Sequence, residues 1–340
     1  MARLLNIFKK FVVIILCLII IPWLYYYVFA YKNLIFSFMA KNGIKGKIVY
    51  SLLTSSDIDV KLFDFATGKK FDIYKTIPRE QEGYFGYVNS FSFSREGNKI
   101  VLSKMNYMEK NHNFKLYTMN IDGTGLTELL DIEGMNLEHP VWSPDGRKVA
   151  FIVQKPYGQG GLYVVDVDKP YSTVKMISNI RPASRRLHWS PDGQEISFIS
   201  DEYIQKRINA RWRSETFDGK TFVVNDSGTD LWQFKSKNPV SWSPNGRMLL
   251  YMDEDGYYLS NENQSQRYLI IPYKRAPLSL LVEDPSFAVW SPDGKYIAYV
   301  KENWPGGAGL GIYVISLDNP AKEIQITTEI YGITEMVWVK

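Results

Sequence analysis

The chain has 340 residues, of which 45% are hydrophobic and 22% charged, a composition that excludes an intrinsically disordered protein. The net charge of +4 arises at the N-terminus, because residues 1–47 hold seven Lys and Arg and no Asp or Glu. The remainder holds 33 Lys and Arg against 36 Asp and Glu, so composition does not support nucleic-acid binding, and we expect none. The single cysteine, Cys17, excludes an internal disulfide and a cysteine-based zinc site.

A long uncharged segment follows a basic head at residues 1–10. Residues 11–30 would span about 30 Å as a helix, which matches the hydrocarbon core of a bilayer. Trp23 and the three tyrosines at 25–27 lie toward its end, where amphipathic rings prefer the membrane interface. We therefore predict an uncleaved transmembrane signal-anchor helix at 11–30 and a linker at 31–46. A signal peptide cleaved after Ala30 is the alternative.

The orientation of the anchor follows from the basic head and the size of the domain behind it. Lys and Arg are nearly balanced on the two sides of the segment, but a short basic head before a large domain favours a cytoplasmic N-terminus. We expect a single-pass protein of the bacterial cytoplasmic membrane, with its large domain on the extracytoplasmic (periplasmic) side. The predicted partners of the protein thus include the membrane, which it would contact through this single helix.

Four near-identical segments recur after residue 47, each reading Trp-Ser-Pro-Asp-Gly or, once, Trp-Ser-Pro-Asn-Gly. A degenerate copy starts at Phe93, and another Trp lies two residues before the end of the chain. The copies are 47 to 53 residues apart, which is typical of a repeat architecture. The motif residues expected to be structural are Trp142, Pro144, Asp145, Gly146, Trp189, Pro191, Asp192, Gly193, Trp242, Pro244, Asn245, Gly246, Trp290, Pro292, Asp293, Gly294 and Trp338.

The motif predicts a tight turn between two strands. Pro fixes φ at the second position of a type I turn, and Gly suits the fourth position. The Trp ends the preceding strand, where its ring can fill the wedge between neighbouring sheets. Alternating strands follow, as at 149–153, 162–166 and 175–177. Four antiparallel strands in each repeat make one blade of a β-propeller.

These copies resemble the TolB-like (WD40-like) propeller repeat, whose hallmark is Trp-Ser-Pro-Asp-Gly followed by a hydrophobic strand. The resemblance covers residues 47–340 and implies an all-β, six-bladed propeller of four-stranded antiparallel blades. The protein that gives the family its name has an α/β domain before its propeller. Here the linker at 31–46 leads almost directly into the first strand, so we expect a member of the family other than that protein.

The two ends of the domain are expected to complete one blade together. The sixth copy has only its first strand, at 336–338, whereas 47–52, 60–65 and 71–74 match the second, third and fourth strands of a blade. We predict that 336–338 pairs with 48–50. This pairing closes the ring and leaves no open edge.

The order of the strands divides the turns between two rims of the propeller. One rim, which we call the repeat rim, holds the Ser-Pro-Asp-Gly turns and the turns between third and fourth strands. The other, the loop rim, holds the links between blades and long, dissimilar loops such as 104–113, 154–161 and 301–309. Variable loops on a rigid scaffold usually carry binding, so we expect a protein partner at the loop rim. The first strand starts at the repeat rim, so the loop rim should face away from the membrane.

Six candidate contact residues follow from this topology. Some precede inner strands and others lie in neighbouring loops, and they are Glu138, His139, Arg185, Arg186, Tyr157 and Trp304. Aromatic and Arg side chains commonly dominate interface energies. No nucleophile, acid–base pair or metal cluster converges in the sequence. We therefore predict a non-catalytic binding scaffold without a metal or cofactor.

The alternative is an enzyme or sensor that acts on a small or carbohydrate ligand in the central funnel. His139 and His188 precede two motif tryptophans and could meet across a blade boundary to bind a metal or an acid. Oligogalacturonate lyases resemble TolB-like propellers and act through a metal held by several His, whereas this chain has three dispersed histidines. No Gly-x-Ser-x-Gly elbow is present, so no hydrolase partner domain is expected.

Overall fold

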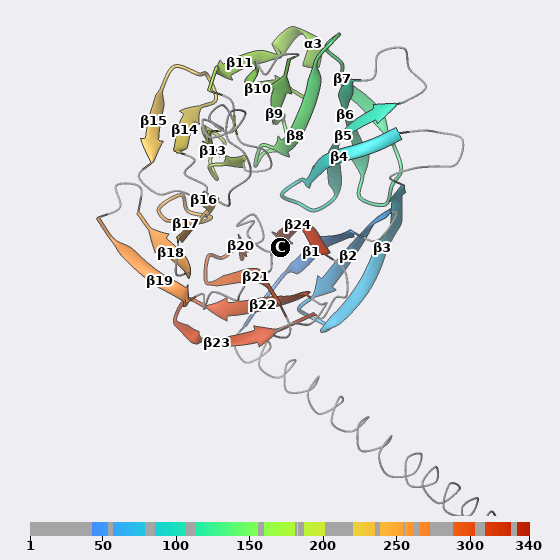
Figure 1. Ribbon diagram of the computed structural model, residues 1–340. Coiled ribbons are helices and arrows are strands. Elements are labelled where there is room, and N and C mark those ends of the chain that lie inside the picture. The colour runs from blue at the N-terminus through green and yellow to red at the C-terminus, as the bar shows by residue number, and fades with distance from the viewer. Residues whose placement is uncertain are drawn as a thin grey trace, which may run out of the picture. The chain divides into compact units, whose positions relative to one another are not determined.

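The strands of the protein form six four-stranded antiparallel sheets around a central axis (Figure 1). The computed structural model describes residues 43–53, 57–78, 86–106, 113–155, 160–180, 182, 187–200, 220–234, 239–253, 256–261, 265–272, 288–302, 310–327 and 332–340. The prediction of an all-β, six-bladed propeller is confirmed.

We number the blades 1 to 6 in the order of their motifs along the chain. Blades 1 and 2 contain β4 (Gly86–Phe93), β5 (Lys99–Asn106), β6 (Phe114–Asn120), β7 (Thr127–Leu130), β8 (Asn136–Trp142), β9 (Lys148–Gln154), β10 (Gly160–Asp166) and β11 (Lys175–Ser178). Blades 3 and 4 contain β12 (His188–Trp189), β13 (Glu195–Ile199), β14 (Thr221–Asn225), β15 (Leu231–Phe234), β16 (Pro239–Trp242), β17 (Leu249–Asp253), β18 (Gly256–Ser260) and β19 (Arg267–Pro272). Blades 5 and 6 contain β20 (Ala288–Trp290), β21 (Tyr296–Glu302), β22 (Leu310–Ser316), β23 (Asn319–Gln325), β24 (Gly332–Val339), β1 (Lys47–Leu53), β2 (Asp57–Asp64) and β3 (Lys69–Pro78).

Blade 6 is built from both ends of the propeller, as the sequence predicts. Its strand order is β24-β1-β2-β3, and β24 runs antiparallel to β1. The register pairs Ile48 with Trp338, Val49 with Val337 and Tyr50 with Met336, which confirms the predicted closure. Pairing the last strand with the first removes two open edges from the ring.

The motif tryptophans fill the wedges between blades. Trp142 is 7% exposed and belongs to a core cluster with Val101 and Leu116 of blade 1 and Val149 and Phe151 of blade 2. The ring therefore packs against two sheets at once, as expected for a large apolar side chain at the end of an inner strand. Burial of this kind ties each blade to its neighbour.

The second strand of each blade contributes another buried layer. Tyr50, Phe151, Phe198 and Tyr251 occupy equivalent positions and are among the largest fully buried side chains. Their neighbours along the strand face the opposite side of the sheet, so alternation with period two buries both faces of this strand between blades. The repeat in the sequence thus becomes a repeat in the core.

Two features differ from the prediction or lie beyond it. The turn between β10 and β11 contains a short helix, α3 (Pro170–Thr173), which the strand pattern does not predict; Pro at its first turn favours helix initiation. In the part of the chain that the structure describes, no helix is long and apolar enough to cross a membrane. The anchor predicted at 11–30 lies outside the described residues.

The chain separates into two compact units. One is the propeller, comprising Gly46–Phe63 and Lys70–Lys340; the other comprises Met1–Lys45 and the turn Asp64–Lys69. In the second unit, the N–H of Gly68 donates to the carbonyl of Asp64 at 2.8 Å and closes that turn.

Candidate functional site

Two of the six predicted contact residues lie together in the middle of an inner strand. Glu138 and His139 are part of β8 and do not precede it, and each is 8% exposed. The N–H of His139 donates to the hydroxyl of Ser90 in blade 1 at 2.8 Å. With so little exposed surface, these residues hold the junction between blades 1 and 2 and offer a partner only a small contact area.

The backbone at this point is irregular. The register of β8 against β9 shifts between Glu138 and Val141, and His139 adopts a φ of 50°, the only positive value at a non-glycine residue in the described chain. A bulge with left-handed backbone at a bulky residue stores strain, and such features cluster near functional sites.

Three other inner strands are also bulged in their loop-rim halves. The register shifts near Asn89 in β4, near Val240 in β16 and near Thr334 in β24. From these bulges to the repeat rim the strands pair regularly. Four of the six inner strands therefore share a bulge in this half, and its place varies from two to four residues before the aromatic residue of the blade.

The other four predicted contact residues, Tyr157, Arg185, Arg186 and Trp304, lie outside the described residues. Their place at the loop rim stays a prediction. The structure brings together only Glu138 and His139 from the predicted set. His188, the other inner-strand histidine, lies on β12 and lines a different region, the central cavity.

A central cavity of about 720 Å³ lies where the inner strands approach the repeat rim. All six blades line it, through motif tryptophans, the prolines that follow them and the residue before each aromatic. Those preceding residues are Ser92, Val141, His188, Ser241, Val289 and Val337. The wall is therefore mixed, with apolar rings and prolines beside polar and charged side chains.

Four charged side chains also line this cavity, and the sequence analysis did not single them out. Arg95, Glu96, Glu335 and Lys340 line the cavity. Arg95 and Lys340 stand two residues after the blade's aromatic, where four blades have proline. The replacement of proline by a basic residue at this position of the repeat could have identified Arg95 and Lys340 from the sequence. The guanidinium of Arg95 donates to the carbonyl of Pro191 in blade 3 at 3.4 Å.

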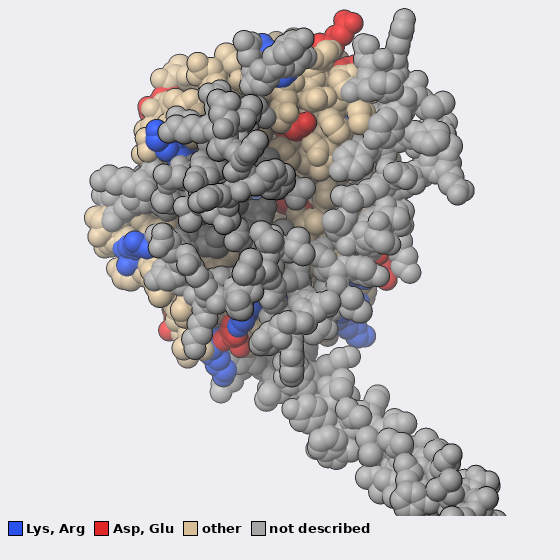
Figure 2. Space-filling view, in the orientation of Figure 1, with Lys and Arg blue, Asp and Glu red and all other residues tan. Residues whose placement is uncertain are grey.

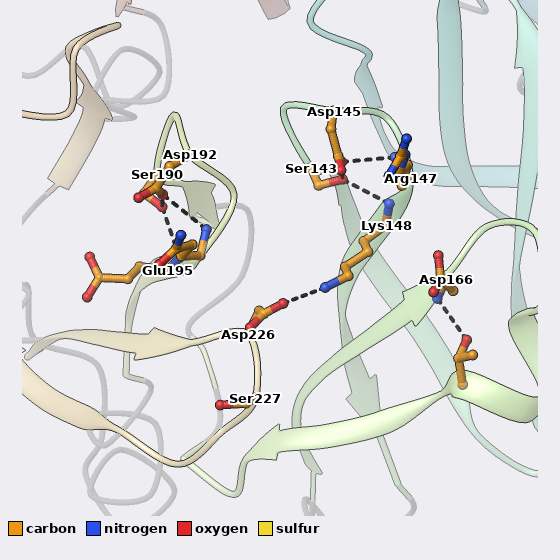
Figure 3. A network of polar contacts seen from close by, with 12 residues as sticks. Ser143, Asp145, Arg147, Lys148, Asp166, Ser190, Asp192, Glu195, Asp226 and Ser227 are labelled. Atoms are coloured by element: carbon orange, nitrogen blue, oxygen red, sulfur yellow. Dashed lines mark hydrogen bonds and ion pairs between the residues drawn. The ribbon is translucent and has the colours of Figure 1, made fainter.

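Each motif turn is closed by its own side chains (Figure 3). In blade 2 the Ser143 hydroxyl donates to the Asp145 carboxylate at 2.6 Å and accepts from the N–H of Lys148 at 2.8 Å. Figure 3 also shows the ammonium of Lys148 paired with Asp226 of blade 3. The motif thus shapes the turn, and its flanking lysine joins neighbouring blades.

The turn environment lowers the pKa of two motif carboxyls. Burial raises the pKa of Asp145, but the Ser143 hydroxyl, the N–H of Arg147 and the Arg147 charge outweigh it and lower the pKa below its ordinary value. The Ser190 hydroxyl, opposed by burial, is the main reason that the pKa of Asp192 is also lowered. Both carboxylates therefore favour the ionised form in the folded protein.

Asp145→Asn should make the protein less sensitive to acid while preserving the turn. Asn245 makes the same contacts in blade 4, at 2.8 Å to the Ser243 hydroxyl and 3.1 Å to the N–H of Arg247, so the turn tolerates the amide. We expect a loss of about 1 kcal/mol or less in the free energy of unfolding at pH 7. Because the folded pKa of Asp145 is lowered, its stabilisation is present above the unfolded pKa and is lost as pH falls through the folded value.

Denaturant titrations at pH 7 and pH 3 measure this difference. The control is Asp168→Asn, which removes the same charge from an exposed position outside the motif. If Asp145→Asn and Asp168→Asn retain the same acid sensitivity as the unmodified protein, the motif carboxylate does not contribute to acid unfolding.

A second polar cluster lies within blade 5. The hydroxyl of the buried Tyr299 donates to Glu323, which also pairs with Lys301. Burial and the Glu323 carboxylate raise the pKa of Tyr299, so its phenol stays protonated. Burial raises the pKa of Glu323, but hydrogen bonds from Lys301 and Tyr299 outweigh burial and lower this pKa below its ordinary value. The cluster therefore joins β21 to β23.

In Figure 2, the visible basic and acidic side chains of the described residues are mixed over the face. They form no large patch of one sign there. This distribution agrees with a propeller whose composition carries no basic bias.

Comparisons with solved structures find the same fold in proteins of different kinds. TolB from Acinetobacter baumannii superposes with a TM-score of 0.60 at 16% identity, over 86% of this chain and 66% of that one. A chain from a nidogen–laminin complex gives 0.54 at 11% identity, over 87% and 99%. Oligogalacturonate lyase from Vibrio parahaemolyticus gives 0.50 at 14% identity, over 79% and 74%. The chain thus spans just under two thirds of the TolB structure.

These low identities establish a shared fold alone. Among curated proteins, none matches the sequence. The family model for the TolB beta propeller domain matches residues 40–265, which is more than half of the chain and includes three of the complete motifs. Together with the six four-stranded blades, this match shows that the chain belongs to the TolB beta propeller domain family.

Proposed function

We propose that the protein is a membrane-tethered, non-catalytic scaffold that binds a protein partner at its loop rim. The observation that carries this proposal is the set of bulges near that rim, whose place in the inner strand varies between blades. Bulges interrupt β4, β8, β16 and β24 there, and His139 is held in a left-handed conformation. A bulge changes the direction in which nearby side chains point. Bulges at different places can therefore give a repeated fold a surface that differs from blade to blade, and such variable surfaces on a rigid scaffold usually carry binding.

The tether belongs to the same proposal. The uncharged segment at 11–30 is long enough to span a bilayer, and the strand that follows it, β1, starts at the repeat rim beside Val339. A chain anchored in this way presents its loop rim away from the bacterial cytoplasmic membrane, on the extracytoplasmic side. TolB and the nidogen–laminin chain share the fold, and the latter was solved as a protein complex.

The topology is tested with the full chain in its native membrane. We expect the mature protein to retain Met1 or Ala2 and a reporter fused after Lys340 to be active only outside the cytoplasm. An N-terminus at Tyr31 would instead establish cleavage and a soluble product. Activity of a cytoplasmic reporter would invert the orientation.

The binding surface is tested by crosslinking followed by affinity measurement. A photoreactive amino acid at Tyr157 or Trp304 should capture the partner, whereas the same group at Asp318, an exposed turn residue on the repeat rim, should not. For the identified partner, Arg185→Ala with Arg186→Ala and Trp304→Ala should weaken binding by about 2 kcal/mol or more, if these residues anchor the interface. Equal capture at the two rims, or unchanged affinity of a folded triple variant, contradicts the proposed surface.

The alternative, an enzyme or sensor acting in the central funnel, is supported by one observation. The cavity of about 720 Å³ is lined by His188 and Glu335 together with apolar rings, prolines and further charged side chains. Turnover of a glycan or peptide by the purified full chain, abolished by His139→Ala or His188→Ala with the fold intact, would replace the scaffold proposal.

A further inference from the structure

One position of the repeat lines the central cavity in every blade. Its residue comes two places after the blade's aromatic residue, and the six residues are Arg95, Pro144, Pro191, Pro244, Pro292 and Lys340. We call this set the cavity ring. Proline has no backbone N–H, so four of the six blades offer no hydrogen-bond donor at this position. The side-chain donors of the cavity ring therefore belong to Arg95 and Lys340.

These two cations come from neighbouring blades that touch at this level. Arg95 lies in the turn after β4 of blade 1, and Lys340 follows β24 of blade 6. A Cβ atom at Gly97 of the blade 1 turn would stand 2.8 Å from Cγ1 of Val339, so the turn packs against the end of β24. Both cations are exposed, and no ion pair joins either of them to a carboxylate of the residues that the structure describes.

The guanidinium of Arg95 holds a weak acceptor that an anion can replace. It donates to the carbonyl of Pro191 in blade 3 at 3.4 Å, so the side chain reaches past blade 2 along the cavity lining. The acceptor is neutral, and the distance is longer than that of an ordinary N–H···O bond. A carboxylate or phosphate oxygen accepts a shorter and stronger bond from a guanidinium. An anion within reach of Arg95 therefore outcompetes this carbonyl.

Two carboxylates also line the cavity, and their positions decide the sign of the site. Glu335 lies within β24, five residues before Lys340, which is on the order of 15 Å along an extended strand. Glu96 follows Arg95 directly and is exposed. At the level of the cavity ring, two positive charges are therefore opposed by the single negative charge of Glu96.

The remaining lining is mainly apolar beside these charges, because the motif tryptophans and the four prolines come from the other side of the ring. We propose that the central cavity binds a small organic anion, whose acidic head group is held by Arg95 and Lys340 and whose apolar portion lies against the prolines and tryptophans. The volume of about 720 Å³ falls within the range of small-molecule sites. This site lies toward the repeat rim, so it does not depend on the partner surface proposed at the loop rim.

Calorimetric titration of the full chain in phosphatidylcholine nanodiscs tests the charge preference of the cavity. The probes are 3-phenylpropionate, phenyl phosphate, 3-phenylpropionamide and 3-phenylpropylamine, which share an aromatic ring and differ in the charge of the head group. At low salt we expect at least one anion to bind about tenfold more tightly than the amide and the amine, and high salt to reduce this difference. The tighter anion identifies the head group. Absence of anion binding, or equal or tighter binding of the amide or the amine, overturns the proposal.

Arg95→Gln should lower the affinity for the anion about tenfold, because it removes a charge-assisted hydrogen bond. Arg95 is exposed and makes one long hydrogen bond, so the variant should fold as the unmodified protein does, which circular dichroism checks. The matched control is Arg247→Gln, which removes an exposed arginine from the motif turn of blade 4, outside the cavity lining. Equal affinities of the two variants contradict the assignment of Arg95.

Glu96→Gln supplies a variant of the opposite sign. The turn of blade 1 does not use this carboxylate, because the Ser94 hydroxyl donates to Asn98 at 3.0 Å. Removal of a like charge beside the head group should raise the affinity for the anion about twofold. If Glu96→Gln and Arg95→Gln instead change the affinity in the same direction, the effect comes from the shape of the turn, and the anion site is wrong.

Discussion

Replacing Trp142 by Ala should lower the free energy of unfolding by about 3–5 kcal/mol. The ring is 7% exposed and belongs to a buried cluster that includes Val101 and Leu116 of blade 1 and Val149 of blade 2. Its removal leaves a cavity that two rigid sheets cannot fill by collapsing. Denaturant unfolding of the full chain in detergent, followed by near-UV circular dichroism, measures the loss.

Trp142→Phe is the matched control, because Phe93 occupies the same position in blade 1. In the described structure the indole N–H of Trp142 has no hydrogen-bond partner, so Phe sacrifices only volume, and we expect a cost below about 1.5 kcal/mol. Trp189→Phe should cost more than that, because the Trp189 indole donates to the carbonyl of Val141 at 3.3 Å. A loss below about 1 kcal/mol for Trp142→Ala would show that burial of the ring does not hold blades 1 and 2 together.

Gly46→Ala should destabilise the closure of the ring by about 3 kcal/mol or more. Gly46 has a φ of 93°, and a Cβ atom there would stand 2.2 Å from the carbonyl oxygen of Val339. That oxygen belongs to β24, which pairs with β1, so the substitution must displace the backbone at the seam between the two ends of the propeller. Equilibrium unfolding and hydrogen exchange of the amides in β1 and β24 measure the effect.

Gly146→Ala separates the clash from the backbone conformation. Gly146 has a φ of 69°, but a Cβ atom there would meet nothing within 4 Å, so only the conformational cost of about 1–2 kcal/mol applies. Exchange in β1 and β24 should be unchanged in this variant. Similar losses in the two variants, without faster exchange at the seam, would mean that the contact between Gly46 and Val339 does not hold the ring closed.

Several elements were predictable because their causes are local. Pro, Asp and Gly at fixed offsets specify a turn wherever they occur, so four motif copies located four blades without tertiary information. The pairing of 48–50 with 336–338 was predictable for another reason. A propeller with an incomplete last blade has an open edge, and only strands at the other end of the domain were left to fill it.

The candidate site was predictable only in part. The sequence analysis expected Glu138 and His139 just before an inner strand, whereas the structure places them within β8, and nothing in the sequence indicated the bulge, the φ of 50° at His139 or the burial of both side chains. A bulge is decided by how two sheets meet, here through Ser90 of the neighbouring blade. The ion pair between Lys148 of blade 2 and Asp226 of blade 3 likewise could not be predicted, because the two residues belong to different repeats.

By itself, the sequence determined the number of blades, the order of their strands and the residues of the motif turns, because each depends on short-range backbone preferences repeated at one period. Only the tertiary structure decided how neighbouring blades meet. It placed Arg95 of blade 1 and Lys340 at the end of blade 6 in the lining of one shared cavity. Such features are formed by residues that lie far apart in the sequence. Solvent exposure likewise depends on the assembled surface, so no single repeat contains it.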